Sequence, residues 1–398
     1  MRISTSMIHT NAVNALLKRQ ANLSRTQSEV ASGLRVQKPS DDPVAAVKIL
    51  QLEQQKSANA QFGANIAAAS TRLEQEEQAL TDSTRLLQRV AELAVQANSS
   101  ALSQFDRQSI ATELTALNSQ LTDIANRKDA NDEFLFSGLS AGIKPFSRDA
   151  SNNVSYAGDA GVREVQIGAA QYVQDGDSGQ AVFMNIAQGN GTFSLSATTG
   201  NTGTGVIAGA VTNPGNWVPD DYMLTFTSPT AWQVTDSSAA VVASGAGYVA
   251  GTAIAFNGVQ VSVTGAAAAG DSFAIEQSRS EDVFTTIDEL ISSLSSGATT
   301  DAAKAAFQNR FNTVMQQLDT TETHILNART SVGARLSMLQ IVESTREDSA
   351  LRLETSLSAV QSSDYTEAVS RLSLQAIGLQ AAQQSYVKIA NLSLFNYL

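Results

Sequence analysis

The chain contains 398 residues, carries a formal net charge of −12, and has no cysteine and two histidines. Disulfides, thiol catalysis and cysteine-ligated metals are therefore excluded, and the length favours two or three domains over one core. The acidic balance argues against binding nucleic acid, because phosphate contacts need clustered Lys and Arg. No membrane span is expected, since no run approaches the roughly 18 apolar residues that a span needs. The N-terminal segment lacks the basic-then-apolar order of a cleavable signal peptide, which predicts that any export proceeds without one.

A narrow apolar stripe with a helical rhythm runs through the first 40 residues. Ile3 and Met7 open it, and Leu16, Leu23 and Val30 follow at intervals of seven residues. This spacing predicts an amphipathic helix with a coiled-coil seam. Glutamines occupy alternate seam positions, so the helix is too polar to pair strongly with its own copies alone and needs a partner.

Glycine and proline residues then end this helix and allow another to start. The junction residues are Gly33, Arg35, Pro39, Ser40, Asp41, Asp42 and Pro43. Asp42 is expected to cap the second helix, with Pro43 at its first helical position. Asp41 and Asp42 could in principle form an acid–base pair, but capping accounts for both carboxylates without a catalytic role.

Two bundle helices are predicted beyond this junction. The first runs from Val44 to about Asn98, and the second follows a break at Ser99 and Ser100. The first seam is Ile66, Leu73, Leu80 and Leu87, and the second is Ile110, Leu114, Leu117, Leu121 and Ile124. These spacings are typical of helices packed in a bundle. A polar break and a short apolar run at residues 131–138 then lead into the middle of the chain.

The composition changes between residues 149 and 278. This segment has ten acids and one base, Arg163, whereas the rest of the chain has a balance of −3. Short alternating runs bounded by Gly, Asn and Pro predict strands and tight turns. The expected strands include residues 162–167, 222–227 and 259–263. Residues 197–215 are expected to form a long loop or a poorly ordered insertion. Trp217 and Trp232 are expected to anchor a small β core, with ligand stacking as the less favoured alternative.

The C-terminal flank returns to a helical pattern. One seven-residue register carries Phe311, Leu318, Ile325, Val332, Leu339, Arg346, Leu353 and Val360. A last helix is expected from Asp364, with Glu367 completing a partial capping box. Its seam carries Leu372, Leu379 and Tyr386.

The C-terminal residues are unusually apolar. They include Leu394, Phe395 and Leu398. Chain ends are normally polar and frayed, so these side chains are expected to be buried in the fold or between subunits.

These patterns predict a mainly α protein with an inserted β domain. Both chain ends form a long coiled-coil-like helical bundle, and the insert is β-rich and mostly antiparallel, with one lobe or two. The predicted domains are residues 1–40 with 365–398, residues 41–145 with 280–364, and residues 146–279. The first is a terminal helical assembly domain, the second a bundle core, and the third an acidic, Gly-rich variable insert.

No catalytic or metal-binding constellation emerges from the sequence. His9 and His324 belong to no paired motif, so no histidine metal site is expected. The closely spaced glycines at 189–191 and 203–205 lack the strand, helix and lysine context of a phosphate loop. No G-x-S-x-G elbow is present. We therefore expect neither enzymatic activity nor a cofactor.

Taken together, these residues resemble the flagellin superfamily, in which helical N- and C-terminal ends co-assemble and a variable domain is inserted between them. The N-terminal signature is Ser32-Gly33-Leu34-Arg35, followed by Pro39-Ser40-Asp41-Asp42-Pro43. Within the superfamily, the chain is more similar to the hook–filament junction type, hook-associated protein 3, than to filament flagellin. This likeness is carried by the proline-flanked aspartates, by Phe134-Leu135-Phe136-Ser137-Gly138 and by the ending Leu392-Ser393-Leu394-Phe395-Asn396-Tyr397-Leu398. It covers about residues 1–145 and 280–398, and the middle segment resembles no family.

The resemblance implies a structural role in motility. Such a subunit is secreted through the flagellar type III export channel without a cleaved signal and forms, with copies of itself, a ring that joins hook to filament and templates flagellin assembly. Its implied partners are flagellin, the adjoining hook-associated junction protein and a flagellar export chaperone at the C-terminal segment. The terminal helices would form the innermost tube and be disordered in the free subunit, which agrees with their narrow seams.

The predicted assembly interface lies on the two terminal helices. Its residues are Ile3, Met7, Leu16, Leu23, Val30, Leu372, Leu379, Tyr386, Leu394, Phe395 and Leu398. Each stripe is too narrow to be stable alone, and pairing with each other and with neighbouring copies would satisfy both. Two alternatives stay open. A filament flagellin, acting as propeller and surface antigen, would share the fold, and a secreted adhesin or enzyme would need a ligand site within residues 150–280.

Overall fold

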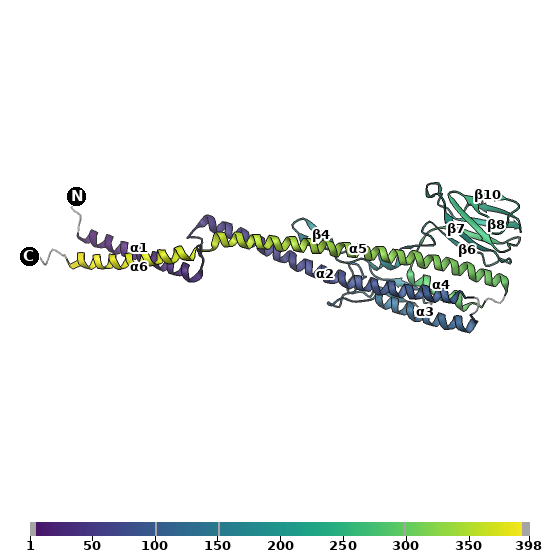
Figure 1. Cartoon of the computed structure of the whole chain (residues 1–398), viewed down its shortest axis with the longest axis horizontal. Coiled ribbons are helices and arrows are strands. Elements are labelled where there is room, and N and C mark those ends of the chain that lie inside the picture. The colour runs from purple at the N-terminus through teal and green to yellow at the C-terminus, as the bar shows by residue number, and fades with distance from the viewer. Residues whose placement is uncertain (1–4, 100–101, 150–151, 298–299, 392–398) are drawn as a thin grey trace, which may run out of the picture. The chain divides into compact units, whose positions relative to one another are not determined.

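The computed structural model describes residues 5–99, 102–149, 152–297 and 300–391 (Figure 1). The chain divides into a smaller unit, Met1–Ala64 with Ile341–Leu398, and a larger unit, Asn65–Gln340. The α-helices are α1 (Thr5–Ser32), α2 (Pro43–Ala97), α3 (Gln104–Ala125), α4 (Val283–Ser295), α5 (Asp301–Gln361) and α6 (Tyr365–Asn391). None of these described helices is long and apolar enough to cross a membrane.

The strands all lie between α3 and α4, as predicted for an inserted domain. They are β1 (Phe146–Arg148), β2 (Val154–Tyr156), β3 (Glu164–Gly168), β4 (Gln171–Gln174), β5 (Ile186–Ala187), β6 (Phe193–Ala197), β7 (Val206–Val211), β8 (Tyr222–Ser228), β9 (Ala231–Thr235), β10 (Val241–Gly245), β11 (Ile254–Phe256), β12 (Val259–Thr264), β13 (Ser272–Gln277) and β14 (Ser280–Glu281). Every pairing among these strands is antiparallel. The predicted mainly α fold with an antiparallel insert is therefore confirmed.

Heptad seams form the helical core of the larger unit. In α2, the predicted seam residues Ile66, Leu73, Leu80 and Leu87 are at most 3% exposed. The buried seam of α5 is Phe311, Leu318, Ile325, Val332 and Leu339. Each fully buried leucine or isoleucine contributes about 2 kcal/mol through the hydrophobic effect. The seven-residue spacing thus fixes which face of each helix is buried.

An aromatic cluster joins the first hairpin, β1–β2, to the helices. Phe136, Phe146, Phe183 and Phe284 are all fully buried. The ring centroids of Phe136 and Phe183 lie 5.1 Å apart and those of Phe146 and Phe183 lie 5.7 Å apart, both edge to face. Such pairs add about 0.5–1.5 kcal/mol beyond burial. The short apolar run at residues 134–136 is therefore part of the core as well as the entry to the insert.

The rest of the insert is a β domain with its own core. One sheet has the order β10-β9-β8-β13-β6 and a second has the order β11-β12-β7. Fully buried side chains such as Phe226 and Val261 form the core, and Trp217 and Trp232 pack against it as expected. The insert therefore has two parts, the hairpins β1–β2 and β3–β4 and this separate domain.

The predicted loop at residues 197–215 is wrong in part. β7 lies within it and pairs with β12 along its whole length, from Val206 opposite Thr264 to Val211 opposite Val259. The alanines and glycine at 208–210 have low strand propensity, and Gly, Thr and Asn surround them. Pairing with β12 outweighs this local preference, which is why the sequence pattern missed the strand.

Two buried amides on α5 hold the β domain. Asn309 and Gln317 are each 3% exposed. Asn309 accepts a hydrogen bond from the Ile207 N–H at 2.8 Å and donates one to the Gly205 carbonyl at 2.9 Å. Gln317 accepts one from the Gly189 N–H at 2.6 Å. These amides satisfy backbone groups that lack a neighbouring strand, so α5 fixes the position of the domain.

Replacing Asn309 with alanine should leave the Ile207 N–H and the Gly205 carbonyl buried without partners. We expect the free energy of unfolding to fall by about 2–6 kcal/mol, because each of the two unsatisfied groups costs about 1–3 kcal/mol. Urea titration followed by circular dichroism measures this change. The control is Asn312→Ala, since Asn312 is exposed on the same helix and accepts a hydrogen bond from Gln308. Equal losses in the two variants would contradict the docking role.

Candidate functional site

The N-terminal and C-terminal segments of the chain contact each other in the smaller unit. The turn after α1 meets the turn between α5 and α6, where Leu34 and Ser362 form an antiparallel bridge. We call residues 33–43 with 360–364 the junction. Segments far apart in sequence are thus held together by backbone hydrogen bonds, which is a stronger geometric constraint than side-chain packing alone.

Gly33 has the backbone conformation that this contact requires. Its φ of +72° lies in the left-handed region, and its N–H donates to the Glu29 carbonyl at 2.8 Å, which ends α1. Its own carbonyl accepts from the Ser363 N–H at 2.9 Å, and the Arg35 N–H donates to the Gln361 carbonyl at 2.8 Å. A residue with a β-carbon would be strained in this conformation.

Asp41 and Asp42 serve the backbone, as predicted. Asp42 Oδ1 accepts from the Ala45 N–H at 3.0 Å and caps α2, and Asp41 Oδ2 accepts from the Lys38 N–H at 3.0 Å. The hydrogen bond from the Ala45 backbone, with Arg35 beside it, holds the pKa of Asp42 below its usual range. Asp42 therefore caps α2, and Asp41 holds the turn before it.

Arg35 links the start of α2 to the end of α5. Its Nη1 lies 3.2 Å from Asp42 Oδ2, and its Nη2 donates to the Val360 carbonyl at 3.0 Å. A small apolar cluster of Val36, Ala45 and Ile49, against which Leu357 and Val360 pack, supports this link. Pro39 and Ser40 lie exposed in the turn before α2. The predicted motif therefore connects the start of α2 to the end of α5.

Glu29 is the junction residue that the sequence analysis missed. It is 8% exposed, and its Oε1 accepts from Ser363 Oγ at 2.6 Å and from Arg371 Nη2 at 2.8 Å. Glu29 lies one residue before Val30, beside the apolar seam, which is the signal that could have indicated burial. It ties α1 to the start of α6.

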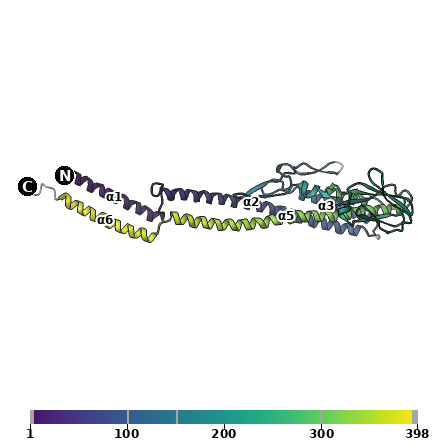
Figure 2. The ribbon, with the colours of Figure 1, turned by 90° about the horizontal axis from the view of Figure 1, so that it is seen from above.

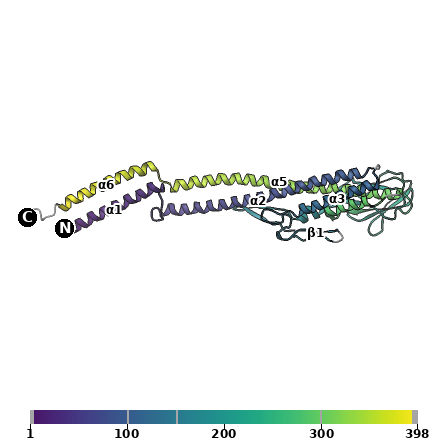
Figure 3. The ribbon, with the colours of Figure 1, turned by 90° about the horizontal axis from the view of Figure 1, so that it is seen from below.

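Helices α1 and α6 run antiparallel and lie side by side, as Figures 2 and 3 both show. The Tyr386 hydroxyl lies 2.9 Å from His9 Nε2 at one end, and Glu29 pairs with Arg371 at the other. Between them, a β-carbon on Gly378 would lie 3.0 Å from an Arg19 nitrogen, so this glycine allows close approach. These contacts define one register along the whole pair.

The predicted interface residues lie on this pair, but mostly on its inner seam. Leu16, Leu23, Val30, Leu372, Leu379 and Tyr386 are half-buried, and Met7 is 60% exposed. Ile3, Leu394, Phe395 and Leu398 lie outside the described residues. A two-helix pair cannot cover its own seam fully, because each helix has only one neighbour.

A second set of apolar residues faces outward, and the sequence analysis did not single it out. Leu17, Leu374 and Ile377 are 57%, 71% and 62% exposed. Heptad counting selects one seam per helix and passes over residues that flank it. The described helices therefore present more apolar surface than the predicted stripe alone.

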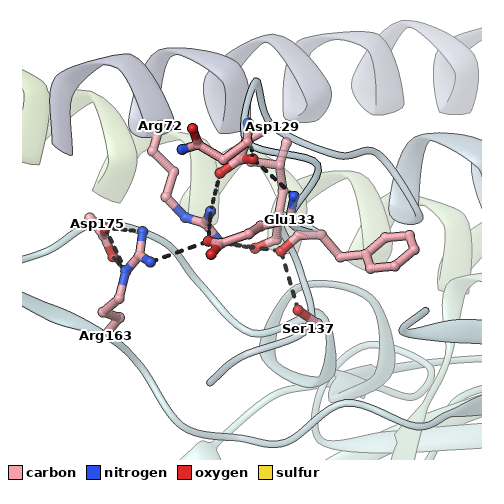
Figure 4. A network of polar contacts seen from close by, with 9 residues as sticks. Arg72, Asp129, Glu133, Ser137, Arg163 and Asp175 are labelled. Carbon is pink, nitrogen blue, oxygen red and sulfur yellow. Dashed lines mark hydrogen bonds and ion pairs between the residues drawn. The ribbon is translucent and has the colours of Figure 1, made fainter. Parts of the chain in front are cut away.

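Charged groups also gather in the larger unit (Figure 4). Arg72, on α2 and 7% exposed, pairs with Asp129 at 2.7 Å. Arg163 pairs with Asp175 at 2.6 Å. Glu133 lies 3.6 Å from Arg72 and 3.3 Å from Arg163, so it bridges the two guanidinium groups. The network fastens the loop after α3 and the hairpin β3–β4 to α2.

Glu76 lies one helical turn beyond Arg72 and is 1% exposed. Its Oε1 accepts from the Asp177 N–H at 3.2 Å, and its Oε2 has no hydrogen-bond partner. Burial, with the Asp177 carboxylate nearby, raises the pKa of Glu76 well above its ordinary value, although Arg335 opposes this. Perturbed carboxyls often mark active sites. The void beside this network measures about 10 Å³, which holds no more than a water molecule.

A larger cavity of about 480 Å³ lies between β6, α4 and α5. Glu281, Glu289 and Arg310 line it. Burial, with Glu289 close by, raises the pKa of Glu281 to about 7, and Gln188 donates to its carboxylate at 3.2 Å. This cavity is where the alternative of a ligand-binding insert has to be tested.

The contacts described above hold helices to one another. In the described ranges, no group of three or more His, Asp or Glu side chains is arranged to hold a metal ion. His9 bonds to Tyr386, and His324 Nε2 lies 2.8 Å from the Ala181 carbonyl. Both histidines therefore have structural partners, and the arrangement as a whole holds helices in register and presents apolar surface.

Comparisons with known proteins agree with this interpretation. Residues 3–141 match the bacterial flagellin N-terminal helical region, and residues 196–277 match the D2-like domain of flagellar hook-associated protein 1. The second match gives the β domain a relative, which the sequence analysis had not found. The paired terminal helices and the inserted domain define a flagellin-like helical protein.

Solved structures identify the family within this class of flagellin-like proteins. A crystal structure of FlgL from Xanthomonas campestris is 35% identical, covers 77% of this chain and 99% of that chain, and has a TM-score of 0.72. Flagellar hook-associated protein 3 (HAP-3) from Legionella pneumophila is 34% identical, with coverage of 78% and 98% and a TM-score of 0.75. The chain belongs to the flagellar hook-associated protein 3 (FlgL) family.

Curated relatives are also flagellar proteins, but they match a shorter part of this chain. Flagellar hook-associated protein 3 of Escherichia coli (strain K12) is 31% identical over 186 residues, which is 47% of this chain. The match spans 58% of the length of that relative. The flagellar filament 41 kDa core protein of Borreliella burgdorferi is 29% identical over 157 residues, or 39% of this chain. None of the relatives named here is described as an enzyme.

Gly33→Ala should weaken the junction. Placing a β-carbon in the left-handed region costs about 1–2 kcal/mol, so we expect the free energy of unfolding of the α1–α6 pair to fall by that amount. Hydrogen exchange of α1 and α6 amides measures it. Gly333→Ala is the matched control, because Gly333 lies within α5 with no atom near its β-position and should gain about 0.5–1 kcal/mol. A Gly33 variant as stable as the parent would exclude strain at this turn.

The stability of the chain should fall as pH rises from about 5 to about 8. Glu281 has an ordinary pKa of 4.5 when unfolded and about 7 when folded, so its protonated form favours folding and that contribution is lost at higher pH. Solvent screening at this part-exposed group limits the loss to about 1–2 kcal/mol. Urea titrations at both pH values measure it.

Glu281→Gln should remove this part of the pH dependence. Glu276→Gln is the control, because Glu276 is an exposed carboxylate that also lines the cavity. If Glu281→Gln and the parent show the same slope with pH, the carboxyl at the cavity is not the group responsible.

Proposed function

We propose that the chain is a structural subunit of the bacterial flagellum, which forms the ring joining hook to filament and templates flagellin assembly. The observation that carries this proposal is the antiparallel α1–α6 pair with uncovered apolar side chains, in a member of the hook-associated protein 3 family. A relative from Legionella pneumophila, 33% identical over 79% of this chain, is described as the flagellar junction protein FlgL.

In this proposal, neighbouring copies cover the outer face of the terminal helices. Leu17, Leu374 and Ile377 are 57%, 71% and 62% exposed, so covering the exposed part of each would contribute about 1–2 kcal/mol. Ile3, Leu394, Phe395 and Leu398, which lie outside the described residues, are proposed to belong to the same interface. The half-buried seam residues would then gain their remaining cover from the same neighbours.

Assembly and folding are coupled in this account. The α1–α6 pair has a single line of contact and would be only marginally stable in the free subunit. Residues 1–40 and 365–398 would therefore be the assembly domain, residues 41–145 with 280–364 the bundle core, and residues 146–279 the solvent-facing insert. The acidic insert would favour solubility and discourage lateral association.

The proposed partners follow from the same role. Copies of the chain would form the ring, with flagellin on one side and the adjoining hook-associated junction protein on the other. A flagellar export chaperone would cover the C-terminal segment before export. The chain would be secreted through the flagellar type III channel without a cleaved signal and remain at the hook–filament junction.

A deletion strain tests the role. Without this chain, we expect intact hooks, no filaments and unpolymerised flagellin in the medium, because flagellin would have no template on which to assemble. Electron microscopy of cells and immunoblots of the medium provide the readout, and complementation with the full chain is the control. Normal filaments in the deletion strain would reject a junction role. Loss of filaments together with loss of secreted flagellin would instead favour the alternative of a filament flagellin.

Removing residues 392–398 should abolish assembly and leave the remaining fold intact. These apolar residues are proposed interface rather than core, so circular dichroism and the urea midpoint should stay within about 0.5 kcal/mol of the parent. Failure to complement the deletion strain is the expected result in cells. A truncated chain that aggregates or loses helicity would show that these residues belong to the core.

A screen of glycans and small molecules against the full chain addresses the remaining alternative. The cavity beside Glu281 and Glu289 is the place where a ligand of the insert would bind. Saturable binding that is lost in Glu289→Gln would favour an adhesin or enzyme carried by the insert. We expect no saturable binding.

A further inference from the structure

The two edges of the five-stranded sheet differ. At one edge, β6 is covered by α5, because Thr313 Oγ1 donates to the Leu195 carbonyl at 2.6 Å. At the other edge, β10 pairs with β9 alone, and no described strand follows it in the sheet (Figure 1). α5 therefore satisfies a backbone acceptor at the β6 edge, whereas no described strand pairs with the β10 edge.

The β10 edge lacks charge and proline, two of the usual protections against pairing with another strand. Residues 237–251 contain no charged residue and no proline. Val241 and Val242 are 56% and 38% exposed. A register shift between Val241 and Ala243 is the single irregularity along this strand pair. Proteins normally protect an exposed edge with lysine, proline or a covering element, and an unprotected edge is a template for another strand.

Two carboxylates lie at the turn that leads into β10. Asp236 Oδ1 accepts from the backbone N–H groups of Ser238 and Ala240, each at 2.9 Å. Hydrogen bonds from the Ser238 hydroxyl and these N–H groups lower the pKa of Asp236. A hydrogen bond from Ser237 lowers the pKa of Asp220, so both groups are ionised at neutral pH. The uncharged strand therefore begins beside a fixed negative charge.

The charge of the whole domain decides between partners. Residues 193–277 contain five acids and no Lys, Arg or His. A second copy of this domain would bring the same unbalanced charge to the edge and be repelled. A strand that carries basic residues would be attracted, with its cationic end beside Asp220 and Asp236.

We propose that the free edge of β10 binds an extended basic peptide segment of another protein by strand addition. Backbone hydrogen bonds to β10 would supply the affinity, and alternate small or β-branched side chains would pack beside Val241 and Val242. The Asp220–Asp236 pair would select a lysine or arginine at one end of the bound strand. This site is separate from the terminal helices, so it does not depend on the ring proposal.

The test uses the full chain and a labelled synthetic peptide, acetyl-Lys-Lys-Thr-Val-Thr-Val-Thr-amide. Hydrogen exchange with mass spectrometry should show slower exchange in residues 237–247 when the peptide is added. Fluorescence anisotropy should show binding that weakens about tenfold from 0.05 M to 0.5 M salt, because the charged contact is screened. The same peptide with Glu in place of both Lys is the control and should bind at least about tenfold more weakly.

Two pairs of variants locate the site. Val242→Lys places a charge on the edge and should abolish binding, whereas Val249→Lys, at a 68% exposed position outside the strand, should not. Asp236→Asn keeps an acceptor oxygen for the turn but loses the charge, and should weaken binding about fivefold. Glu276→Gln removes a charge elsewhere in the domain and should change affinity less than about twofold.

Three results would overturn the proposal. Equal binding of the acidic peptide would remove the charge argument. Protection outside residues 237–247 would place the site elsewhere. Protection of β10 that rises with chain concentration in the absence of peptide would identify a second copy as the partner.

Discussion

Two helices lying side by side leave an outer face of each in water, and the α1–α6 pair carries apolar residues on that face. The inner seam holds Leu16, Leu23, Leu372 and Leu379 only half-buried, and Leu374 remains 71% exposed. The hydrophobic effect favours any neighbour that covers this surface. The other contacts of the smaller unit hold α1 and α6 in one register relative to each other.

The junction supplies that register. Gly33 turns the chain in a left-handed conformation, Asp42 starts α2, and Glu29 binds both Ser363 and Arg371. Each contact involves backbone or a buried charge, so a shift of one helix past the other by a turn would break several at once. Such a fixed geometry at the chain ends is what the proposed ring of subunits would require.

The sequence predicted the helices and their buried faces because seven-residue spacing depends on local geometry. Ile66, Leu73, Leu80 and Leu87 were assigned correctly for this reason.

Features that depend on pairing between segments distant in sequence were missed. The strand β7 is made largely of alanine, glycine and valine and exists because β12 lies beside it. Asn309 and Gln317 look like ordinary polar helix residues, and only the docked β domain shows that they are buried. Glu29 is hidden from pattern analysis for the same reason, because its partners come from the other end of the chain. The capping role of Asp42 was predictable, since a cap depends on its immediate neighbours.

The central claim is that neighbouring subunits complete the burial of the terminal helices. Hydrogen exchange with mass spectrometry, performed on the free chain and on purified hook–filament junctions, tests it most directly. The account predicts that amides of α1 and α6 exchange quickly in the free chain and about 1,000-fold more slowly in the assembled junction, while the buried face of α2 in the larger unit is protected in both. Equal protection of α1 and α6 in the free and assembled states would show that the pair is stable without neighbours and would contradict the account.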